Sequence, residues 1–171
     1  MNKLNRTPLH DFLIELGAKM TEFAGWEMPI QFGKGIISEH LHVRRHAGLF
    51  DVSHMGQIEV PIEKAKELEF IIPNNLSLLS EGRMQYCVMT NEKGGIRDDL
   101  LVAKLKNKLL LIVNAALKNN DYEVFSDIIK KENVLIRDDR SLLALQGPRS
   151  SAVLERYIPK IKDINFLDVL E

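Results

Sequence analysis

The chain has little of several features that would assign it to a specialised class of protein. Its 171 residues contain a single cysteine, Cys87, which excludes an internal disulfide framework and fits a reducing compartment. The 23 basic and 24 acidic residues give a net charge of −1, so no basic excess points to nucleic acid. Glycine occurs in neither the Gly-x-Gly-x-x-Gly pattern nor the Walker pattern that binds phosphates.

Long apolar runs are also missing. The longest, residues 109–113, has the length of a strand, whereas a membrane span needs about 20 residues. The first six residues, 1–6, contain neither the apolar core of a signal peptide nor an amphipathic presequence. We therefore expect a cytoplasmic protein without a membrane segment.

The remaining pattern is that of one globular domain, with 45% hydrophobic residues. Hairpins mixed with helices, without sustained βαβ alternation, predict an α+β fold with mostly antiparallel sheet and flanking helices. Capping signals and helical spacing predict helices at residues 7–16, 36–46, 63–72, 121–131 and 148–158. Strands are predicted at residues 18–23, 57–62, 85–90, 100–105, 109–115, 134–137 and 142–146.

Some segments carry more specific expectations. Residues 25–29, with the only tryptophan, are interpreted as an irregular loop, and the strand at residues 57–62 as half-buried. In the helix at residues 36–46 we expect Ile36, Ile37, Leu41 and Val43 to point inward. The apolar stretch at residues 165–171 either docks as a short strand or helix or belongs to a longer chain.

A double aspartate, Asp98-Asp99, stands between a turn signal at residues 91–95 and the strand predicted from Leu100. Adjacent side chains of an extended chain point to opposite sides, so at most one carboxylate faces a given pocket. Two interpretations are open. Both aspartates bond to the backbone of the turn, or one of them contacts a ligand amine, holds a cation or acts as a base.

The segment Phe50-Asp51-Val52-Ser53-His54-Met55 also carries polar groups at the edge of strand-like sequence. A serine hydrolase is disfavoured, because neighbouring side chains of a strand point apart and no Gly-x-Ser-x-Gly elbow surrounds the serine. We expect a packed methionine and a hydrogen-bonded histidine.

Four histidines crowd one region, and His42 and His46 have the i, i+4 spacing that can present two imidazoles to one metal. The chain lacks a His-Glu-x-x-His motif, and Arg44 and Arg45 would repel a cation. A solvated basic helix face is favoured, and no metal is expected.

Tyr86, Cys87 and Asn114 place polar or polarisable groups within apolar strand segments. A buried asparagine must find hydrogen-bond partners. Asn114 is therefore either a satisfied amide at a strand end or a group that hydrogen-bonds a flat ligand in an apolar cleft.

Taken together, these segments resemble the T-protein of the glycine cleavage system, a folate-dependent aminomethyltransferase. The matches run nearly the whole chain, and their number and order make them specific. They comprise residues 7–9, 17–20, 23–29, 48–56, 86, 91–100, 113–116 and 144–148.

The resemblance implies a fold and a reaction. The fold is the T-protein-like folate-binding fold, of which residues 1–171 form the N-terminal portion, incomplete at the C-terminus. The reaction transfers an aminomethyl group from lipoylated H-protein to tetrahydrofolate, a co-substrate, and gives 5,10-methylenetetrahydrofolate and ammonia. No metal takes part.

The resemblance also implies the site residues. Asp99, the second aspartate of its motif, matches the family's key residue at the pterin, where it orients folate and supports attack on the aminomethyl carbon. Met55, Tyr86, Leu101, Ile112 and Asn114 match positions that line the same folate site.

Two departures from the family pattern qualify these expectations. Ala103 stands where the family often has an aromatic residue, which loosens the expected pocket. The chain also stops before the family's later segments, including a glycine-tyrosine-threonine-glycine-glutamate stretch and an arginine-bearing segment. The alternatives are an inactive fragment, one half of an enzyme completed by a separate C-terminal half, or a non-catalytic folate-binding protein or part of a related demethylase. We also expect exposed apolar edges.

Overall fold

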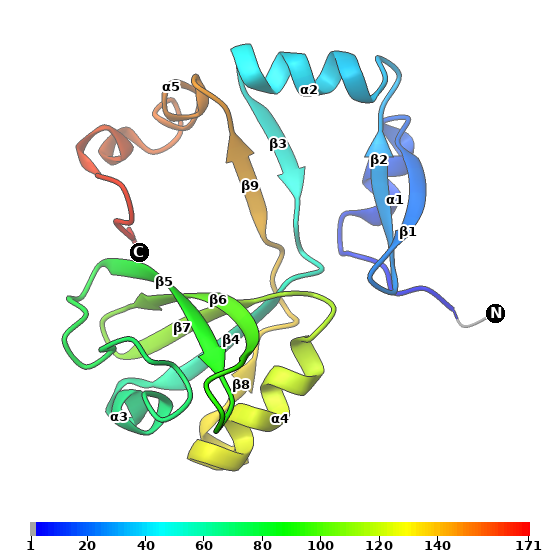
Figure 1. The fold of residues 1–171 in the computed structure, drawn as a ribbon. Helices are drawn as coiled ribbons and strands as arrows, with labels where there is room; N and C mark the ends of the chain where they lie inside the picture. The colour runs from blue at the N-terminus through cyan, green and yellow to red at the C-terminus, as the bar shows by residue number, and fades with distance from the viewer. Residues whose placement is uncertain (1–2) are drawn as a thin grey trace. The chain divides into compact units, whose positions relative to one another are not determined.

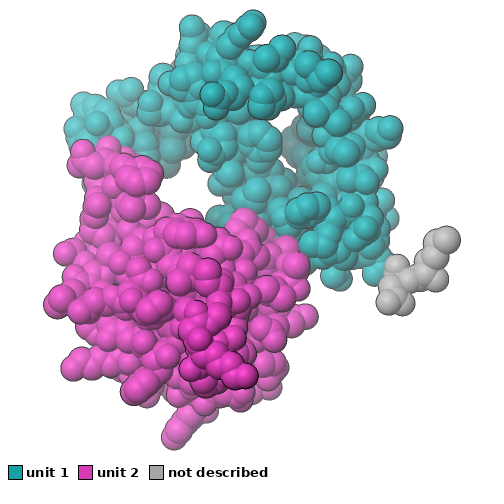
Figure 2. All heavy atoms as spheres, viewed as in Figure 1, with its two compact units in different colours: residues 1–54, 140–163 teal, residues 55–139, 164–171 magenta. Residues whose placement is uncertain are grey.

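The computed structural model describes residues 3–171; Met1 and Asn2, which belong to the N-terminal stretch considered above, lie outside the described residues. The chain divides into two compact units, coloured separately in Figure 2. The first comprises residues 3–54 and 140–163, and the second residues 55–139 and 164–171. All ladders between the described strands are antiparallel, so the predicted α+β fold with mostly antiparallel sheet is confirmed.

The second unit is built on a five-stranded sheet of order β5-β6-β7-β4-β8. Figure 1 shows the two helices of this unit, α3 and α4, on one face of the sheet. The elements are β4 (Gly56–Pro61), η1 (Ile62–Lys64), α3 (Ala65–Leu68), β5 (Arg83–Thr90), β6 (Ile96–Lys104), β7 (Lys108–Val113), α4 (Lys118–Ile129), η2 (Lys131–Asn133) and β8 (Leu135–Ile136).

The face that α3 and α4 cover holds the apolar core of the second unit. Along β6 and β7, alternate side chains are buried, because successive residues of a strand point to opposite faces. Leu100, Val102 and Leu111 pack there with Phe125 and Ile129 of α4, all at most 3% exposed. Each such side chain contributes about 1.5–3 kcal/mol when fully buried. The other face of these strands is not covered by α3 or α4 (Figure 1).

The strand predicted as half-buried is buried on both faces. All residues of β4 except Pro61 are buried: β7 and β8 flank the strand, and the Lys108 and Arg137 side chains approach Glu59. Its polar residues have partners at this depth. Glu59, which is 8% exposed, accepts a hydrogen bond from Lys108 Nζ at 2.9 Å. Alternation of polar and apolar residues therefore predicted the strand correctly but not its environment.

The first unit contains two separate two-stranded antiparallel sheets, β1-β2 and β3-β9. Its elements are α1 (His10–Glu15), β1 (Lys19–Phe23), β2 (Trp26–Gln31), α2 (Ile36–Arg45), β3 (Gly48–Asp51), β9 (Leu143–Gln146), α5 (Ser150–Leu154) and η3 (Pro159–Asp163).

Residues 25–29 were predicted as an irregular loop, and this prediction is wrong. They form a hairpin with β1 through the two-residue turn Ala24-Gly25, whose φ angles are 51° and 80°. Positive φ at both positions is what a type I′ turn requires, and this turn matches the twist of the flanking strands. Pro29 is tolerated in β2 because a two-stranded sheet has only edge strands.

The helices of the first unit also differ from expectation. The Thr7 hydroxyl does not cap α1, because the helix begins at His10 with Leu9 as its N-cap; the hydroxyl donates to Asp51 Oδ2 at 2.6 Å. In α2, Ile36, Ile37 and Leu41 were predicted to point inward but are 52%, 77% and 44% exposed. The two-stranded sheets of this unit offer little surface against which α2 can pack. The exposed fractions of these side chains agree with the prediction that apolar surface is exposed.

Two further helices are shorter than predicted. The segment at residues 63–72 forms η1 and the four-residue α3, and the segment at residues 148–158 forms only the five-residue α5. Helix boundaries are the least certain part of any sequence-based assignment.

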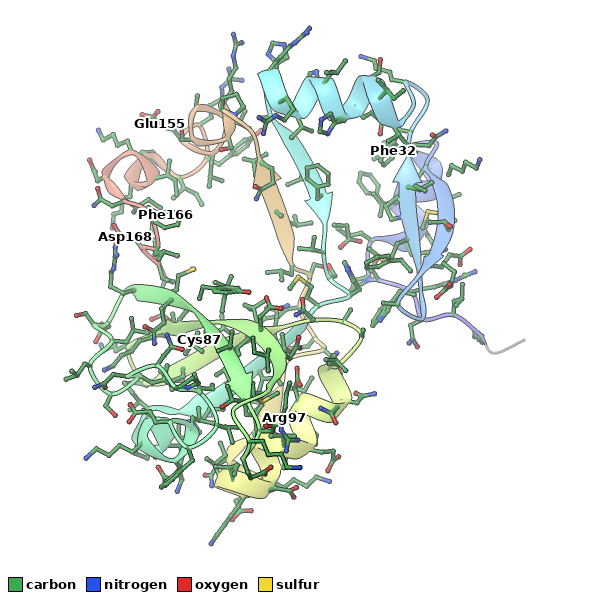
Figure 3. All side chains as sticks on the ribbon, viewed as in Figure 1. Phe32, Cys87, Arg97, Glu155, Phe166 and Asp168 are labelled. Atoms are coloured by element: carbon green, nitrogen blue, oxygen red, sulfur yellow. The ribbon has the colours of Figure 1, made fainter. Side chains whose placement is uncertain are left out.

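The apolar stretch at residues 165–171 docks within the second unit. Met84 N donates to Leu167 O at 2.9 Å, and Val169 N donates to Gly82 O at 2.7 Å. The Arg83 guanidinium pairs with the Asp168 carboxylate, next to the labelled Phe166 in Figure 3. The segment thus adds backbone and ionic contacts to the start of β5. Within residues 3–171, no helix is both long and apolar enough to cross a membrane.

The close packing of the backbone around Gly147, in the first unit, can be tested by substitution. Its φ is 113°, and an added Cβ would lie 2.4 Å from His46 O and 2.6 Å from Val43 O. We expect Gly147→Ala to lower the free energy of unfolding by about 2–3 kcal/mol, because backbone strain and a backbone clash add. Urea denaturation followed by Trp26 fluorescence reports on this unit.

The control is Gly33→Ala, at a glycine with no atom within 4 Å of its added Cβ and no positive φ. It should change stability by less than about 1 kcal/mol. Equal effects of the two substitutions would contradict the close approach of the helix end to Gly147.

Candidate functional site

The face of the five-stranded sheet opposite α3 and α4 presents most of the residues singled out in the sequence. The register places Tyr86 opposite Leu101, and Leu101 opposite Ile112. Side chains directly opposite on neighbouring strands lie side by side on one face. Tyr86 is 59% exposed, and the other two are half-buried. Three strands therefore form an accessible surface of one aromatic and two aliphatic side chains.

The double aspartate lies within β6 rather than before it. Asp98 is 9% exposed on the side of the core, and Asp99 is half-buried on the side of Tyr86 and Leu101. The prediction that the two carboxylates point to opposite sides is therefore confirmed by their burial. Their assignment as turn residues is wrong, because the backbone of the turn is bonded by the Asn91 side chain, through Lys93 N and Gly95 N at 2.9 Å.

Asn114 links the two aspartates. Its Nδ2 donates to Asp98 Oδ1 at 2.9 Å and to Asp99 O at 3.1 Å, and lies 3.3 Å from Asp99 Oδ1. Asn114 directly follows β7, which ends at Val113, so its side chain is not restricted to one face by the ladder. The amide that the sequence left open as a strand-end group is therefore tied to both carboxylates.

Tyr86 and Met55 complete this surface. The hydrogen bond to Asp99 raises the pKa of Tyr86, and desolvation and the negative charges of Asp99 and Asp98 add to this effect. Met55 immediately precedes β4, whose first residue, Gly56, pairs with Val113. It therefore lies next to the end of β7 that carries Asn114. All six predicted site residues belong to the second unit.

Sequence reasoning missed Asp121, a third carboxyl group beside the pair. It lies on α4, is 1% exposed, and its pKa is raised to about 7 by burial, then by the neighbouring Asp98 carboxyl and its charge; the Asn120 side chain acts in the opposite direction. Asp121, Phe125 and Ile129 are the buried residues of α4. Their i, i+4, i+8 spacing puts a carboxyl on the apolar stripe of the helix, and this signal could have identified it.

Ser53 and His54 have structural surroundings. The Ser53 hydroxyl donates to Leu142 O at 3.3 Å and accepts from Leu142 N at 3.0 Å. The His54 ring makes an edge contact with Phe23 at 5.7 Å between centroids, and burial lowers its pKa. The predicted hydrogen bond of this ring is missing at Nδ1, which is buried without a partner. These contacts agree with the absence of a serine nucleophile.

The remaining candidates do not form a site. The His42 and His46 rings lie 4.9 Å apart at the C-terminal end of α2, where His46 is the capping residue, and no cluster of three or more potential metal ligands occurs among the residues that the structure describes. Burial raises the pKa of Cys87 to about 11, which keeps its thiol protonated. Ala103 pairs with Met84 and Leu110 and is 4% exposed, so its small side chain is covered.

The first unit contains a mostly apolar pocket of about 500 Å³. It is lined by β2, α2 and β3, and includes Met28, Phe32, Val43 and Phe50. Both carboxylates of its lining are already engaged: Glu39 accepts from Phe32 N at 2.8 Å, and Asp51 accepts from Thr7. The motifs at residues 26–29 and 50–51 therefore contribute to packing in this unit.

The fold and the open sheet face define a class: an antiparallel α+β domain that presents a carboxylate and an amide on an apolar surface. The profile of the GCVT N-terminal domain matches residues 9–171, and the chain belongs to this family. The resemblance to the glycine cleavage T-protein that the motifs indicated is confirmed.

Three relatives illustrate the match. The chain is 38% identical to the mitochondrial aminomethyltransferase of Dictyostelium discoideum over 99% of this chain and 44% of that protein. It is 42% identical to the aminomethyltransferase of Thermotoga neapolitana over 91% of this chain and 44% of that protein. The crystal structure of glycine cleavage system aminomethyltransferase T from Bartonella henselae matches with a TM-score of 0.86 and 34% identity, over 97% of this chain and 47% of that chain. The chain spans a little under half the length of these relatives.

Asp121 makes stability depend on pH. Its pKa of about 7 lies above its usual value of 3.8, so the folded state retains a proton that the unfolded state releases. The stabilisation is complete below about pH 4 and is lost as pH rises through about 7, a change of about 4 kcal/mol at 1.36 kcal/mol per pKa unit. We expect Asp121→Asn to abolish this slope and to be more stable than the wild type at pH 8.

Urea denaturation by circular dichroism at pH values from 4.5 to 8 measures this dependence. Asp127→Asn, an exposed position of the same helix, is the matched control and should keep the wild-type slope. A slope unchanged in Asp121→Asn would show that this carboxyl ionises normally.

Proposed function

We propose that this chain supplies the tetrahydrofolate-binding face of an aminomethyltransferase of the glycine cleavage system. The one-carbon unit comes from the aminomethyl group on lipoylated H-protein, and the products are 5,10-methylenetetrahydrofolate and ammonia. Because the relatives are about twice as long, the complete reaction is proposed for this chain together with the equivalent of their remaining sequence, on the same or a second polypeptide. We place this activity in the cytoplasm.

The observation that supports this proposal is the position of Asp99. It is a half-buried carboxylate on the exposed face of the sheet, next to the apolar side chains of Leu101 and Ile112. A pterin is flat and carries ring N–H and amino donors along one edge. An apolar surface with a few fixed polar groups suits such a ligand. Asp99 accepts from the donor edge, while Leu101, Ile112, Met55 and Tyr86 contact the ring system.

The same carboxylate suits the chemical step. When an amine of tetrahydrofolate attacks the aminomethyl carbon, positive charge develops on the attacking nitrogen. A carboxylate held beside that nitrogen stabilises the charge without reorganising, and the fixed ring is positioned for attack. Asn114 supports both effects because its amide bonds to the backbone and the side chain of Asp99.

Asp99→Asn tests the assignment while keeping the shape of the side chain. We expect calorimetric titration of the purified chain with tetrahydrofolate to show binding that weakens about 10- to 150-fold in the variant, since losing a hydrogen bond to a charged group costs about 1.5–3 kcal/mol. Asp127→Asn, an exposed aspartate of the same unit, should bind as the wild type does.

Two results would contradict the proposal. Equal binding by the wild type and Asp99→Asn would remove Asp99 from the folate site. No binding to the chain, alone or with a C-terminal half of a relative added, would remove folate from this sheet face. Binding without any turnover on lipoylated H-protein, in the presence of that half, would favour the alternative of a non-catalytic folate-binding protein.

A further inference from the structure

Two carboxyl groups of the second unit, Asp98 and Asp99, meet around the Asn114 amide, and a third, Asp121, acts on Asp98. Asn114 Nδ2 donates to Asp98 Oδ1 and lies within hydrogen-bond distance of Asp99 Oδ1. The second oxygen of Asp98 and both oxygens of Asp121 are buried and receive no hydrogen bond from any donor of the described residues. Buried polar atoms in native proteins almost always have a partner, so these three oxygens require an explanation.

A single proton explains all of them. Two buried carboxylates that face each other repel, and both are acceptors only. If one keeps its proton, it becomes a donor, and the pair is joined by a charge-assisted hydrogen bond. Asp121 is the better holder of the proton, because Asp98 already accepts from Asn114, while Asp121 is 1% exposed and its oxygens have no described donor in hydrogen-bond geometry. The Asn120 side chain opposes the rise in the pKa of Asp121 but is the smallest of the influences on it.

The surrounding charges do not offer an alternative partner. Lys118, on the same helix as Asp121, pairs with Asp138. Next to α3, Lys64 pairs with Glu67 at 2.9 Å, and on β6 Arg97 pairs with Glu92 at 3.4 Å. Of the described residues, Asp98 contributes the charge that raises the pKa of Asp121, and the Asn120 side chain opposes it.

We propose that Asp121 is a positioning residue of the folate site: its protonated carboxyl donates to Asp98, and so holds Asp98 and the Asn114 amide in the arrangement that fixes Asp99. The contacts run from Asp121 on α4, through Asp98 on the core side of β6, to Asp99 on its open side. Asp121 itself touches no ligand. The role in folate binding rests on the proposed function, whereas the coupling of Asp121 to Asn114 is independent of any ligand.

The first experiment uses the protein without folate. Nuclear magnetic resonance follows the carboxyl carbon of Asp121 and the side-chain NH₂ of Asn114 between pH 5 and 9. In the wild type we expect both signals to shift with one common midpoint near pH 7. In Asp121→Asn, which carries a donor at every pH, the Asn114 signals should not shift. Asp127→Asn should behave as the wild type does. Asn114 signals that stay constant while Asp121 titrates would overturn the proposal. This result comes from the wild type alone, so it does not depend on whether a variant folds.

The second experiment measures tetrahydrofolate affinity from pH 6 to 8.5. Wild-type affinity should fall above pH 7, and Asp121→Asn should bind with little pH dependence. Asp121→Leu, which fills similar space without a donor, should bind about tenfold more weakly at pH 6.5, equivalent to about 1.4 kcal/mol.

The two experiments separate the two hypotheses. Coupled signals of Asp121 and Asn114 without folate binding by any variant would support the positioning and contradict the folate function. Folate binding that depends on Asp99 but is equal in Asp121→Asn and Asp121→Leu at every pH would overturn the positioning role and leave the function intact.

Discussion

The pairing of β6 with β5 and β7 is the constraint on which the rest of the second unit depends. Its register directs Leu100 and Val102 into the core and Asp99 and Leu101 to the open face. A slip of one residue would exchange the two sets and place Asp99 in the core. The buried apolar side chains under α3 and α4 make such a slip costly. The hydrophobic core therefore also determines which aspartate is available to a ligand.

The same register positions the carboxyl groups of Asp98 and Asp99, but the strand ladder does not supply their hydrogen-bond donors. Asn114 escapes the alternation because β7 ends one residue earlier, and so its amide reaches carboxylates on both faces of β6. An amide has two donors, which is too few for three carboxyl groups. The proton on Asp121 supplies the missing donor, at the cost of stability when pH rises above its unfolded pKa.

The sequence predicted local order well and surroundings poorly. Apolar runs bounded by turn signals located β5, β6 and β7, and the structure confirms them as strands whose side chains largely alternate between a buried and a more exposed side. Alternation located β4 but not its burial on both faces, since this burial depends on side chains from elsewhere in the chain, such as Lys108 and Arg137 against Glu59, which no local pattern reveals. The residues of the candidate site were named from the family motifs. Their common location on one sheet face depends on register across strands, and this cannot be read from any single segment.

Two conspicuous polar residues of the motifs, Ser53 and Glu27, make structural contacts. Ser53 closes a loop onto Leu142, and Glu27 bonds to Arg6 and His10, so both motifs hold the first unit together. Asp121 belongs to no motif used above, because one aspartate near the start of a helix is ordinary in any sequence. Its significance arises only when the helix packs against β6 and leaves it facing Asp98. A motif is recognised by residues that are adjacent in the sequence. The pKa of a carboxyl such as Asp121 is instead shifted by burial, and burial is a property of the assembled fold.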